Sequence, residues 1–376
     1  MTKRILQFGT SRFLQAHVDL FVHEARQSGQ AIGPITVVKT TAGGPRGSRI
    51  EALGSAKGFP VRLRGYDNGR LVDEIINVQS VNRAIDANKD WPGLIKIFSN
   101  ETDIVVSNVG DGGYELARDD QLRPHSLDVM PAGFPAKLLA LLIHRFENGA
   151  RPLLVLPCEL VSSNGRVLRQ ILTGLAEAWG EREAFNAWLA GSVMFCDTLV
   201  DRIVSESIEP IGAVAEPYGF WAIKRQPGFE PPFQHPNITY TDDLEPFLRL
   251  KLHILNLGHT YLAQIWLAER RPSDETVRGM LSNLDIRHRL ISLYDNEIIP
   301  GFGAHDMMEA ATRYVATTLE RFENPFLNHR VSDIAQNHAI KIERRVNDFI
   351  AWAKKPNPSL MLPRLAELGG AMQSPP

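Results

Sequence analysis

The stretch Ile5-Leu6-Gln7-Phe8-Gly9-Thr10-Ser11-Arg12-Phe13 runs from a short apolar segment through a glycine into a helical pattern. Such an apolar run before a turn signal is typical of a strand that is buried on both faces. In a doubly wound α/β fold, the turn after this strand places a dinucleotide pyrophosphate on a helix N-terminus. The complete Gly-x-Gly-x-x-Gly fingerprint is absent, because Ser11 stands where a second glycine is expected. An ordinary strand-to-helix turn is therefore the alternative.

The pattern of this first unit continues along the N-terminal half of the chain. Apolar runs alternate with helical patterns, and this alternation predicts a parallel sheet with helices on both faces. The runs cover residues 5–8, 35–38, 104–107 and 153–156, and the helical patterns include about 13–28 and 135–148. Residues 61–78 differ, because alternating residues around Asp67-Asn68-Gly69 predict an antiparallel excursion with a tight turn.

The character of the sequence changes near residue 240. Residues 223–237 are rich in Pro, Gln and Phe and are expected to form a loop or linker. The acidic residues and proline of Asp242-Asp243-Leu244-Glu245-Pro246 indicate a helix start, and helical patterns continue to about residue 354. We therefore expect an α/β plus all-α protein. A Rossmann-like parallel-sheet domain would cover 1–240 and an all-helical substrate and catalytic domain 241–376, with a peripheral tail after Lys354.

One helical segment carries polar side chains on an apolar face. It reads Lys251-Leu-His-Ile-Leu-Asn256-Leu-Gly-His259. At about 100° per residue, Lys251, Asn256 and His259 fall within an arc of roughly 140°. Leaving such groups unpaired in apolar surroundings costs several kcal/mol. Either Lys251 extends to solvent and the other two are satisfied in the core, or the three side chains point into a site.

Composition excludes several classes of protein. The chain has 376 residues, of which 44 % are hydrophobic and 22 % charged, with a net charge of −2, so no basic excess indicates nucleic acid or a membrane surface. Two cysteines, Cys158 and Cys196, cannot form a disulfide framework and are expected to be small buried side chains in a reducing compartment. The sequence contains neither a CxxC nor an HExxH motif, so no metal site is predicted. The first apolar run is too short for a signal peptide or a membrane span, so we expect a soluble cytoplasmic protein.

Six motifs, in the same order along the chain, resemble the mannitol dehydrogenase family of polyol-specific long-chain dehydrogenases. Within the family they are most similar to the altronate oxidoreductase (tagaturonate reductase) branch. The motifs are Gln7-Phe8-Gly9-Thr10-Ser11-Arg12-Phe13-Leu14, Val106-Ser107-Asn108 with Gly112-Gly113, Pro157-Cys158-Glu159-Leu160 with Asn164-Gly165, the segment Phe195-Cys196-Asp197-Thr198-Leu199-Val200-Asp201-Arg202-Ile203-Val204, Lys251-x4-Asn256-x2-His259, and Arg321-Phe322-Glu323-Asn324-Pro325.

The resemblance implies an enzyme that moves a hydride between NAD(P) and a sugar acid or polyol without a metal. The closest model reaction interconverts a keto sugar acid and its aldonate, as with tagaturonate and altronate. By this resemblance Lys251 is the general acid/base, Asn256 polarises the carbinol or carbonyl oxygen, and His259 holds the substrate. A base for this step must lie within about 3 Å of the hydroxyl oxygen whose proton it removes.

The resemblance also implies which residues bind the cofactor. These are Phe8, Gly9, Thr10, Ser11, Arg12 and Phe13 in the first turn, Lys39 after the second strand, and Asn108, Val109 and Gly110 in a later loop. NAD is the expected cofactor. However, Lys39, Arg46 and Arg49 stand where NAD-binding folds usually carry an acidic residue. They could accept the 2′-phosphate of NADP or be solvated loop charges, so NADP is not excluded.

Substrate binding is expected to involve Glu159 and Asn164 together with His259. Structural alternatives are a purely structural carboxylate at Glu159 and a helix cap at Asn164. The carboxylate of a sugar acid needs a cation, and the candidates are His329, Arg330, His338 and Lys341.

The sequence also departs from the family pattern. Leu160 stands where mannitol-type members carry an asparagine that helps to hold the developing oxyanion, and the chain is shorter than typical altronate-branch members. Two alternatives to a sugar-acid enzyme stay open. One is a dehydrogenase of a neutral or phosphorylated polyol of the mannitol or arabinitol type. The other is a non-catalytic binding protein on a degenerate dehydrogenase scaffold. In each case a monomer or homodimer is expected.

Overall fold

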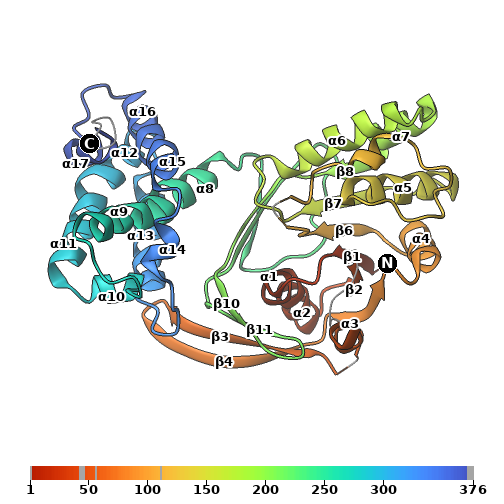
Figure 1. The fold of residues 1–376 in the computed structure, drawn as a ribbon, viewed down its shortest axis with the longest axis horizontal. Helices are drawn as coiled ribbons and strands as arrows, with labels where there is room; N and C mark the ends of the chain where they lie inside the picture. Colours follow the sequence, from red (N-terminus) through yellow and green to blue (C-terminus); the bar gives the residue numbers. More distant parts are fainter. Residues whose placement is uncertain (1, 42–46, 56, 111, 371–376) are drawn as a thin grey trace. The chain divides into compact units, whose positions relative to one another are not determined.

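The computed structural model describes residues 2–41, 47–55, 57–110 and 112–370, which form two compact units (Figure 1). Arg46, one of the candidate phosphate-binding residues, lies outside the described residues. The first unit consists of Met1–Leu63, Glu74–Ala215 and Gly219–Leu244, and the second of Arg64–Asp73, Glu216–Tyr218 and Glu245–Pro376. Two short segments from earlier in the chain therefore belong to the unit that contains the C-terminal helices.

The first unit is built on a six-stranded parallel sheet, as the alternating pattern predicted. Its strand order is β5-β2-β1-β6-β7-β8. The strands and helices of this layer are β1 (Lys3–Phe8), α1 (Arg12–Leu14), η1 (Gln15–Asp19), α2 (Leu20–Gln27), β2 (Ile32–Lys39), α3 (Gly47–Leu53), β5 (Val81–Asp86), α4 (Trp91–Asn100), β6 (Ile104–Ser107), η2 (Arg118–Gln121), α5 (Phe134–Glu147), β7 (Leu153–Pro157), α6 (Asn164–Ala178), α7 (Glu183–Ser192) and β8 (Val193–Phe195). Because β2 and β6 flank β1, the chain changes direction across the sheet next to the first turn.

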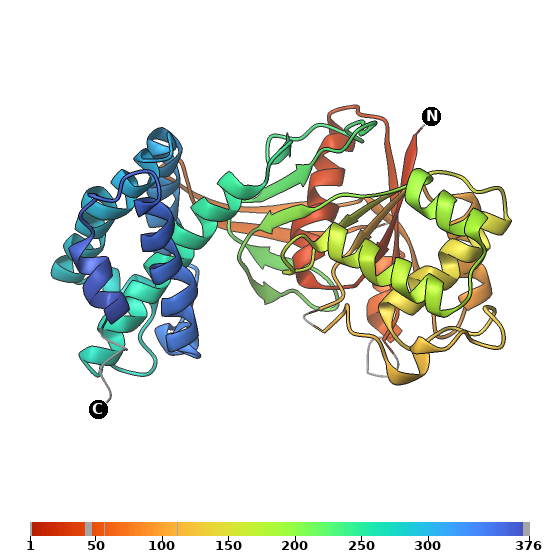
Figure 2. The ribbon, with the colours of Figure 1, turned by 90° about the horizontal axis from the view of Figure 1, so that it is seen from above.

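Alternate side chains of each strand enter two separate cores, one on each face of the sheet. In β1, Ile5 packs with α2, while Leu6 and Phe8 pack with α4 and α5. The helices α5 and α6 cover the second face (yellow to yellow-green in Figure 2). Burial on both faces explains why the strands read as continuous apolar runs.

Two smaller sheets accompany the parallel sheet, and most of their strands were not anticipated. They have the orders β10-β11-β3-β4 and β13-β12-β9. Their strands are β3 (Phe59–Asp67), β4 (Arg70–Val78), β9 (Thr198–Asp201), β10 (Val204–Ser207), β11 (Ala213–Ala215), β12 (Phe220–Lys224) and β13 (Ile238–Thr241). The neighbours β3 and β4 are joined at Asn68-Gly69, the turn that the sequence indicated.

The expected linker over 223–237 is wrong in part. Ile223 and Lys224 belong to β12, and Phe233 is buried in the same core as β12 and α2. The hydroxyl of Tyr240 donates to the carbonyl of Phe233 at 2.6 Å. Proline prevents most of this segment from forming regular strands, but its aromatic residues still anchor it to the sheet.

The second unit is helical, apart from the two segments that it takes from earlier in the chain. Its helices are α8 (Glu245–Leu250), η3 (Lys251–Asn256), α9 (Leu257–Ala268), α10 (Val277–Leu281), α11 (Leu284–Leu293), η4 (Tyr294–Ile298), α12 (Ile299–Gly303), α13 (Met308–Phe322), α14 (Val331–Ile334), α15 (His338–Ile342), η5 (Glu343–Asn347), α16 (Asp348–Lys354) and α17 (Pro363–Gly370). Here η3, η4 and η5 are π-helical turns within longer helices.

The tail beyond Lys354 is not peripheral, contrary to the expectation from sequence. Leu362, Leu365 and Leu368 are buried in the core of the helical unit. The buried carboxylate of Glu297 accepts hydrogen bonds from the backbone N–H groups of Arg364 and Leu365, at 2.9 and 3.0 Å. This carboxylate satisfies orphan donors at the start of α17 and fixes the helix to the core.

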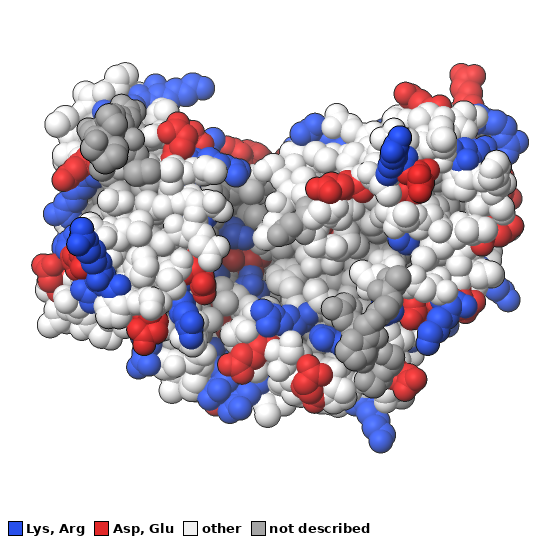
Figure 3. All heavy atoms as spheres, in the orientation of Figure 1, with Lys and Arg blue, Asp and Glu red and all other residues white. Residues whose placement is uncertain are grey.

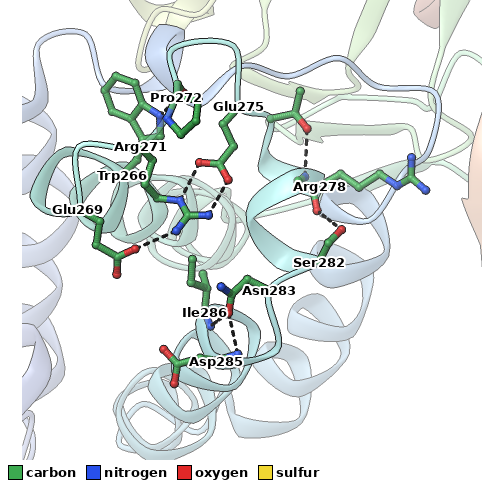
Figure 4. Close-up of polar contacts among 12 residues, drawn as sticks. Trp266, Glu269, Arg271, Pro272, Glu275, Arg278, Ser282, Asn283, Asp285 and Ile286 are labelled. Carbon is green, nitrogen blue, oxygen red and sulfur yellow. Dashed lines mark hydrogen bonds and ion pairs between the residues drawn. The ribbon is translucent and has the colours of Figure 1, made fainter.

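Polar contacts hold the connections between α9, α10 and α11 (Figure 4). Arg271 forms two bonds of 2.7 Å to Glu275 and one of 2.9 Å to Glu269. The side chain of Asn283 caps α11 by accepting from the N–H groups of Asp285 and Ile286. These turns therefore satisfy their own polar groups at the surface.

Charged residues of both signs are interspersed over the face drawn in Figure 3. None of the described helices is long and apolar enough to cross a membrane. Cys158 and Cys196 are both buried and form no disulfide, as the sequence predicted.

Candidate functional site

The carboxyl ends of β1, β2 and β6 surround a pocket of about 430 Å³ in the first unit. This is the place where open α/β sheets bind ligands. Eight of the ten residues predicted to bind cofactor line it, and they are Gly9, Thr10, Ser11, Arg12, Lys39, Asn108, Val109 and Gly110. The pocket also includes Arg49.

Gly9 is required by the close approach of two strand ends. Its φ is +116°, and an added Cβ would lie 2.5 Å from the carbonyl oxygen of Asn108. Both the backbone conformation and the space therefore exclude a side chain. A bare backbone at this point is what a pyrophosphate needs in order to approach the following helix.

Ser11 does not need to be a glycine. Its φ of −68° and ψ of 148° are extended values that any residue adopts, and its hydroxyl accepts a hydrogen bond from the N–H of Leu14. The same hydroxyl lies 3.2 Å from the side-chain oxygen of Asn108. Ser11 is thus the N-cap of the helix and a link to the neighbouring loop. The departure from the glycine fingerprint leaves the turn geometry intact.

Two of the predicted cofactor residues lie outside the pocket. The ring of Phe8 is fully buried and packs edge-to-face on Phe134, with centroids 5.3 Å apart. The ring of Phe13 stacks on His17 at 4.8 Å. Both rings thus hold the turn against the core of the unit, while the backbone between them lines the pocket.

The basic residues near β2 differ in their partners. The ammonium of Lys39 is 3.1 Å from Asp86 at the end of β5, and it is buried. This contact and Asn88 hold the pKa of the Asp86 carboxyl below its usual range, although burial opposes the shift. The Nε of Arg49 is buried, and no residue within the described ranges hydrogen-bonds it. Lys39 is therefore neutralised by a local carboxylate, whereas Arg49 keeps donor capacity.

Glu159 holds the loop that follows β6. Its carboxylate accepts from the hydroxyls of Ser107 and Tyr114, at 3.1 and 3.0 Å, and from the N–H of Val109 at 3.2 Å. Burial raises the pKa of this carboxyl, and these hydrogen bonds oppose the shift. The side chain of Asn108 is also held in place, because its amide donates a hydrogen bond to the carbonyl of Cys158 at 2.8 Å. Glu159 therefore positions the pocket wall formed by Val109.

The Asn164 amide has no capacity left for a substrate. It is buried, its nitrogen donates to the carbonyls of Pro157, Glu159 and Thr198, and its oxygen accepts from two backbone N–H groups. The residue fastens the loop after β7 to β9. Leu160, in the same motif, is 77 % exposed.

The three residues predicted to be catalytic lie on the continuous helix formed by η3 and α9. Lys251 and Asn256 are the first and last residues of the π-helical turn η3, and His259 follows in α9. An α-helical wheel places Lys251 and Asn256 about 140° apart. Hydrogen bonds from i to i+5 instead return the fifth residue to the same side of the helix. The turn therefore groups the two side chains more closely than the α-helical spacing predicts.

Side chains from α9 and from two other helices satisfy the backbone of this π turn. The hydroxyl of Tyr294 donates to the carbonyl of Ile254 at 3.0 Å. The carbonyl of Asn256 accepts from Thr260 and from the guanidinium of Arg345, at 3.0 and 3.1 Å. Tyr294 and Arg345 were not recognised in the sequence, because a residue that supports a distant carbonyl leaves no local signal.

The side chains of Asn256 and His259 differ in burial and in their neighbours. Asn256 is half-buried, and its side-chain amide has no hydrogen-bonding partner in the part of the chain that the structure describes. The His259 ring is buried, with Phe322 at 4.4 Å and His329 at 4.8 Å between ring centroids. The Asn256 amide is thus available to polarise a ligand oxygen.

The candidate cations for a carboxylate separate into two groups. His329 faces His259, and Arg330 is exposed and pairs through its backbone with Thr276. His338 and Lys341 lie together on α15, which packs against α9. Arg345 extends this second group.

The motif that begins at Arg321 attaches the two earlier segments to the helical unit. The buried guanidinium of Arg321 binds Glu216 in a bidentate manner, at 3.0 and 2.8 Å. The amide of Asn324 donates to the carbonyl of Arg64 at 3.0 Å. Arg321 and Asn324 are therefore structural, whereas Phe322 of the same motif packs against the ring of His259 in the candidate site.

Two family models together match most of the chain. The model of the mannitol dehydrogenase Rossmann domain matches residues 3–233, and that of the mannitol dehydrogenase C-terminal domain matches residues 243–368. Altronate oxidoreductase of Bacillus subtilis is 30 % identical over 368 residues, which cover 91 % of this chain and 73 % of the relative. Altronate oxidoreductase of Halalkalibacterium halodurans is 28 % identical over 394 residues, with 98 % and 75 % covered.

Solved structures show the same fold at low sequence identity. D-sorbitol dehydrogenase in substrate-free form superposes with a TM-score of 0.75 at 17 % identity, covering 92 % of this chain and 75 % of that one. The ternary complex of Pseudomonas fluorescens mannitol 2-dehydrogenase with NAD and D-mannitol gives 0.70 at 18 % identity, covering 100 % and 85 %.

Proposed function

The chain belongs to the mannitol dehydrogenase family, and from this membership we propose that it is an NAD-dependent oxidoreductase of a sugar acid. The proposed reaction interconverts a keto sugar acid and its aldonate, with tagaturonate and altronate as the model pair. The names of the curated relatives support this substrate class. The observation that carries the proposal is the half-buried Asn256 amide without a partner among the described residues, on the same π turn as Lys251.

In this proposal the helical unit handles the proton and the oxygen. NAD supplies the hydride acceptor when it is bound. Lys251 removes the hydroxyl proton during oxidation and returns it during reduction, and Asn256 donates a hydrogen bond to the reacting oxygen. His259 holds a neighbouring substrate hydroxyl. These roles follow the family motif and fit the positions of the residues on η3 and α9.

The pocket beside Gly9 fits the pyrophosphate half of a dinucleotide. Its glycine turn, helix start and open strand ends are the features that such a ligand uses. Gly9, Thr10 and Ser11 would hold the pyrophosphate, and Asn108 and Val109 would line the side toward β6.

We propose NAD rather than NADP because Asp86 already neutralises Lys39. The catalytic efficiency with NADH should therefore exceed that with NADPH. An Asp86→Asn substitution should narrow the difference by freeing the ammonium for a 2′-phosphate. An equal preference in the native enzyme would contradict this assignment.

The test of the proposed function is the oxidation of NADH or NADPH, followed by absorbance at 340 nm. The purified chain is given tagaturonate, other keto sugar acids and uncharged ketoses. Rapid turnover with a keto acid is the expected result. Activity with uncharged ketoses alone would move the protein to the polyol branch. If no substrate is turned over while NADH still binds, the catalytic proposal is wrong.

A further inference from the structure

Two buried glutamines flank the turn that follows β1. Gln7 lies in β1 and Gln15 begins η1, and each is only 1 % exposed. The side-chain amide of Gln7 donates to the carbonyl of Gly9 at 3.4 Å, and that of Gln15 donates to the carbonyl of Thr10 at 3.3 Å. Two successive carbonyls of the turn are therefore directed at buried side chains inside the first unit.

The direction of these carbonyls fixes the direction of two backbone N–H groups. In a planar trans peptide, the C=O of one residue and the N–H of the next residue point in opposite directions. The carbonyl of Gly9 shares a peptide with the N–H of Thr10, and the carbonyl of Thr10 shares one with the N–H of Ser11. Because both carbonyls face buried amides, the N–H groups of Thr10 and Ser11 face the other way, and both residues line the pocket beside Gly9.

These two N–H groups are available to a ligand. No described residue accepts a hydrogen bond from the N–H of Thr10 or Ser11. The N–H of Gly9 differs, because it donates to the carbonyl of Val38 near the end of β2, at 3.2 Å. Successive backbone N–H groups that point to one side form a binding site for an anion. The turn thus presents an adjacent pair of donors to a phosphate oxygen.

Stability alone does not account for the glutamine at position 7. Its side-chain oxygen is buried, and none of the described residues hydrogen-bonds it. A buried acceptor without a partner destabilises the folded state, whereas a methionine of similar length would fill the same space without a strong acceptor. What methionine would lack is the donor that holds the carbonyl of Gly9.

We propose that Gln7 and Gln15 are positioning residues for the dinucleotide cofactor. By holding two carbonyls of the turn, their amides keep the N–H groups of Thr10 and Ser11 directed at the pyrophosphate. This inference rests on the proposed function and names the residues that prepare its cofactor site. It also explains how the turn can carry a side chain at Ser11, because buried amides orient the peptides where the fingerprint of dinucleotide-binding folds relies on a second glycine.

The test measures NADH affinity of the full chain by fluorescence titration, together with the midpoint of denaturant unfolding. Gln7→Met keeps the length of the side chain and removes the donor to Gly9. The peptide between Gly9 and Thr10 can then rotate, so we expect the dissociation constant for NADH to rise about three- to ten-fold, with an unchanged or higher unfolding midpoint. Gln226→Met is the matched control and should keep native affinity, because the amide of Gln226 donates to the carbonyl of Phe195, outside the pocket.

Two competitors locate the effect within the pocket. ADP contains the pyrophosphate group, whereas adenosine has no phosphate. In Gln7→Met the inhibition constant of ADP, as a competitor of NADH, should rise by the same factor as the dissociation constant for NADH, and that of adenosine should stay unchanged. Gln15→Met is an independent variant if Gln7→Met does not fold. It should weaken NADH and ADP binding in the same way, and its unfolding midpoint should fall because the N–H of Gly212 loses the Gln15 oxygen as its acceptor.

Native NADH affinity in Gln7→Met would overturn the assignment. So would an equal loss of ADP and adenosine binding, or a loss of NADH affinity together with a lower unfolding midpoint in Gln7→Met, because either result indicates a general distortion of the unit. Turnover is measured separately. A native chain that binds NADH, shows the expected effect of Gln7→Met and yet oxidises NADH with no keto acid would contradict the proposed function alone.

Discussion

The pocket beside Gly9 and the π turn at Lys251 are built in opposite ways. The pocket is made of strand ends and backbone, and its shape follows from one glycine and one N-cap serine. The π turn is made of side chains on a helix whose carbonyls are satisfied by Tyr294 and Arg345 from other helices. The first feature depends on local sequence, whereas the second depends on residues far away in the chain.

This difference explains what substitutions should do in the two regions. A substitution in the pocket should cause a steric clash or strain the backbone. It should therefore change cofactor affinity and stability. A change around the π turn should act through the placement of functional groups, and therefore on turnover. The following experiments test this separation.

Lys251→Ala should have the largest effect. Loss of the proposed general acid/base should lower kcat by about a hundred- to ten-thousand-fold. Affinity for NADH, measured by fluorescence titration, should remain native because the pocket beside Gly9 is unchanged. Lys355→Ala, at an exposed position, is the control and should keep native turnover. Near-native kcat in Lys251→Ala would remove this residue from the mechanism.

Gly9→Ala should damage the pocket itself. Its added methyl group would meet the Asn108 carbonyl at 2.5 Å, at a φ of +116°. Strain and overpacking together should lower the free energy of unfolding by about 2–4 kcal/mol and weaken NADH binding. Gly29→Ala has a similar positive φ, of +82°, but nothing within 4 Å of the added Cβ. The control should cost about 1–2 kcal/mol and leave NADH binding intact. Equal behaviour of the two variants would show that the close approach is unimportant.

The helical unit should lose stability in mild acid through His253. This imidazole is buried, with one nitrogen 3.1 Å from the Arg345 carbonyl and the other 3.1 Å from the Arg249 guanidinium. Burial lowers its pKa from 6.5 to about 4, so the folded state resists a proton that the unfolded chain accepts. The stabilising contribution is complete above pH 6.5 and falls as pH decreases toward 4.

The expected loss is about 3 kcal/mol between pH 7 and pH 4, measured by denaturant unfolding. His253→Gln should be less sensitive to pH over this range, because it lacks the titrating group. If the free energy of unfolding depends on pH equally in the native protein and in His253→Gln, the effect does not come from His253. Hydrogen exchange of backbone amides in the helical unit would separate its unfolding from that of the first unit.

Tyr294→Phe should give the smallest effect and the sharpest comparison. The variant removes the donor to the Ile254 carbonyl of the π turn, and Tyr240→Phe removes an analogous donor to the Phe233 carbonyl in the first unit. Each should lower the free energy of unfolding by about 1–2 kcal/mol. Only Tyr294→Phe should also lower kcat, because only its carbonyl lies between Lys251 and Asn256. Reduced turnover in both variants would mean that stability, rather than the π turn, controls activity.

The sequence predicted the parallel sheet, its central strands, the turn at Asn68-Gly69 and the start of the helical unit. These features depend on local patterns, which are the apolar runs, the Asn-Gly turn and the acidic helix start around Pro246. The small strands β9–β13 were missed, because strands of three to five residues carry too few positions for a period to be recognised. The tail was misjudged, since the leucines beyond Lys354 do not reveal by their spacing which surface they cover.

By itself, the sequence determined the two classes of architecture, the glycine turn and the identities of Lys251, Asn256 and His259, because each depends on residues close together in the chain. Only the tertiary structure decided that Ser11 is a cap, that the Asn164 amide is fully used and that Lys39 is paired with Asp86. It also decided that a π turn groups the catalytic candidates and that Arg345 binds the carbonyl of Asn256. These outcomes depend on partners distant in sequence, and hydrogen bonding to a distant partner leaves no periodic trace in the chain.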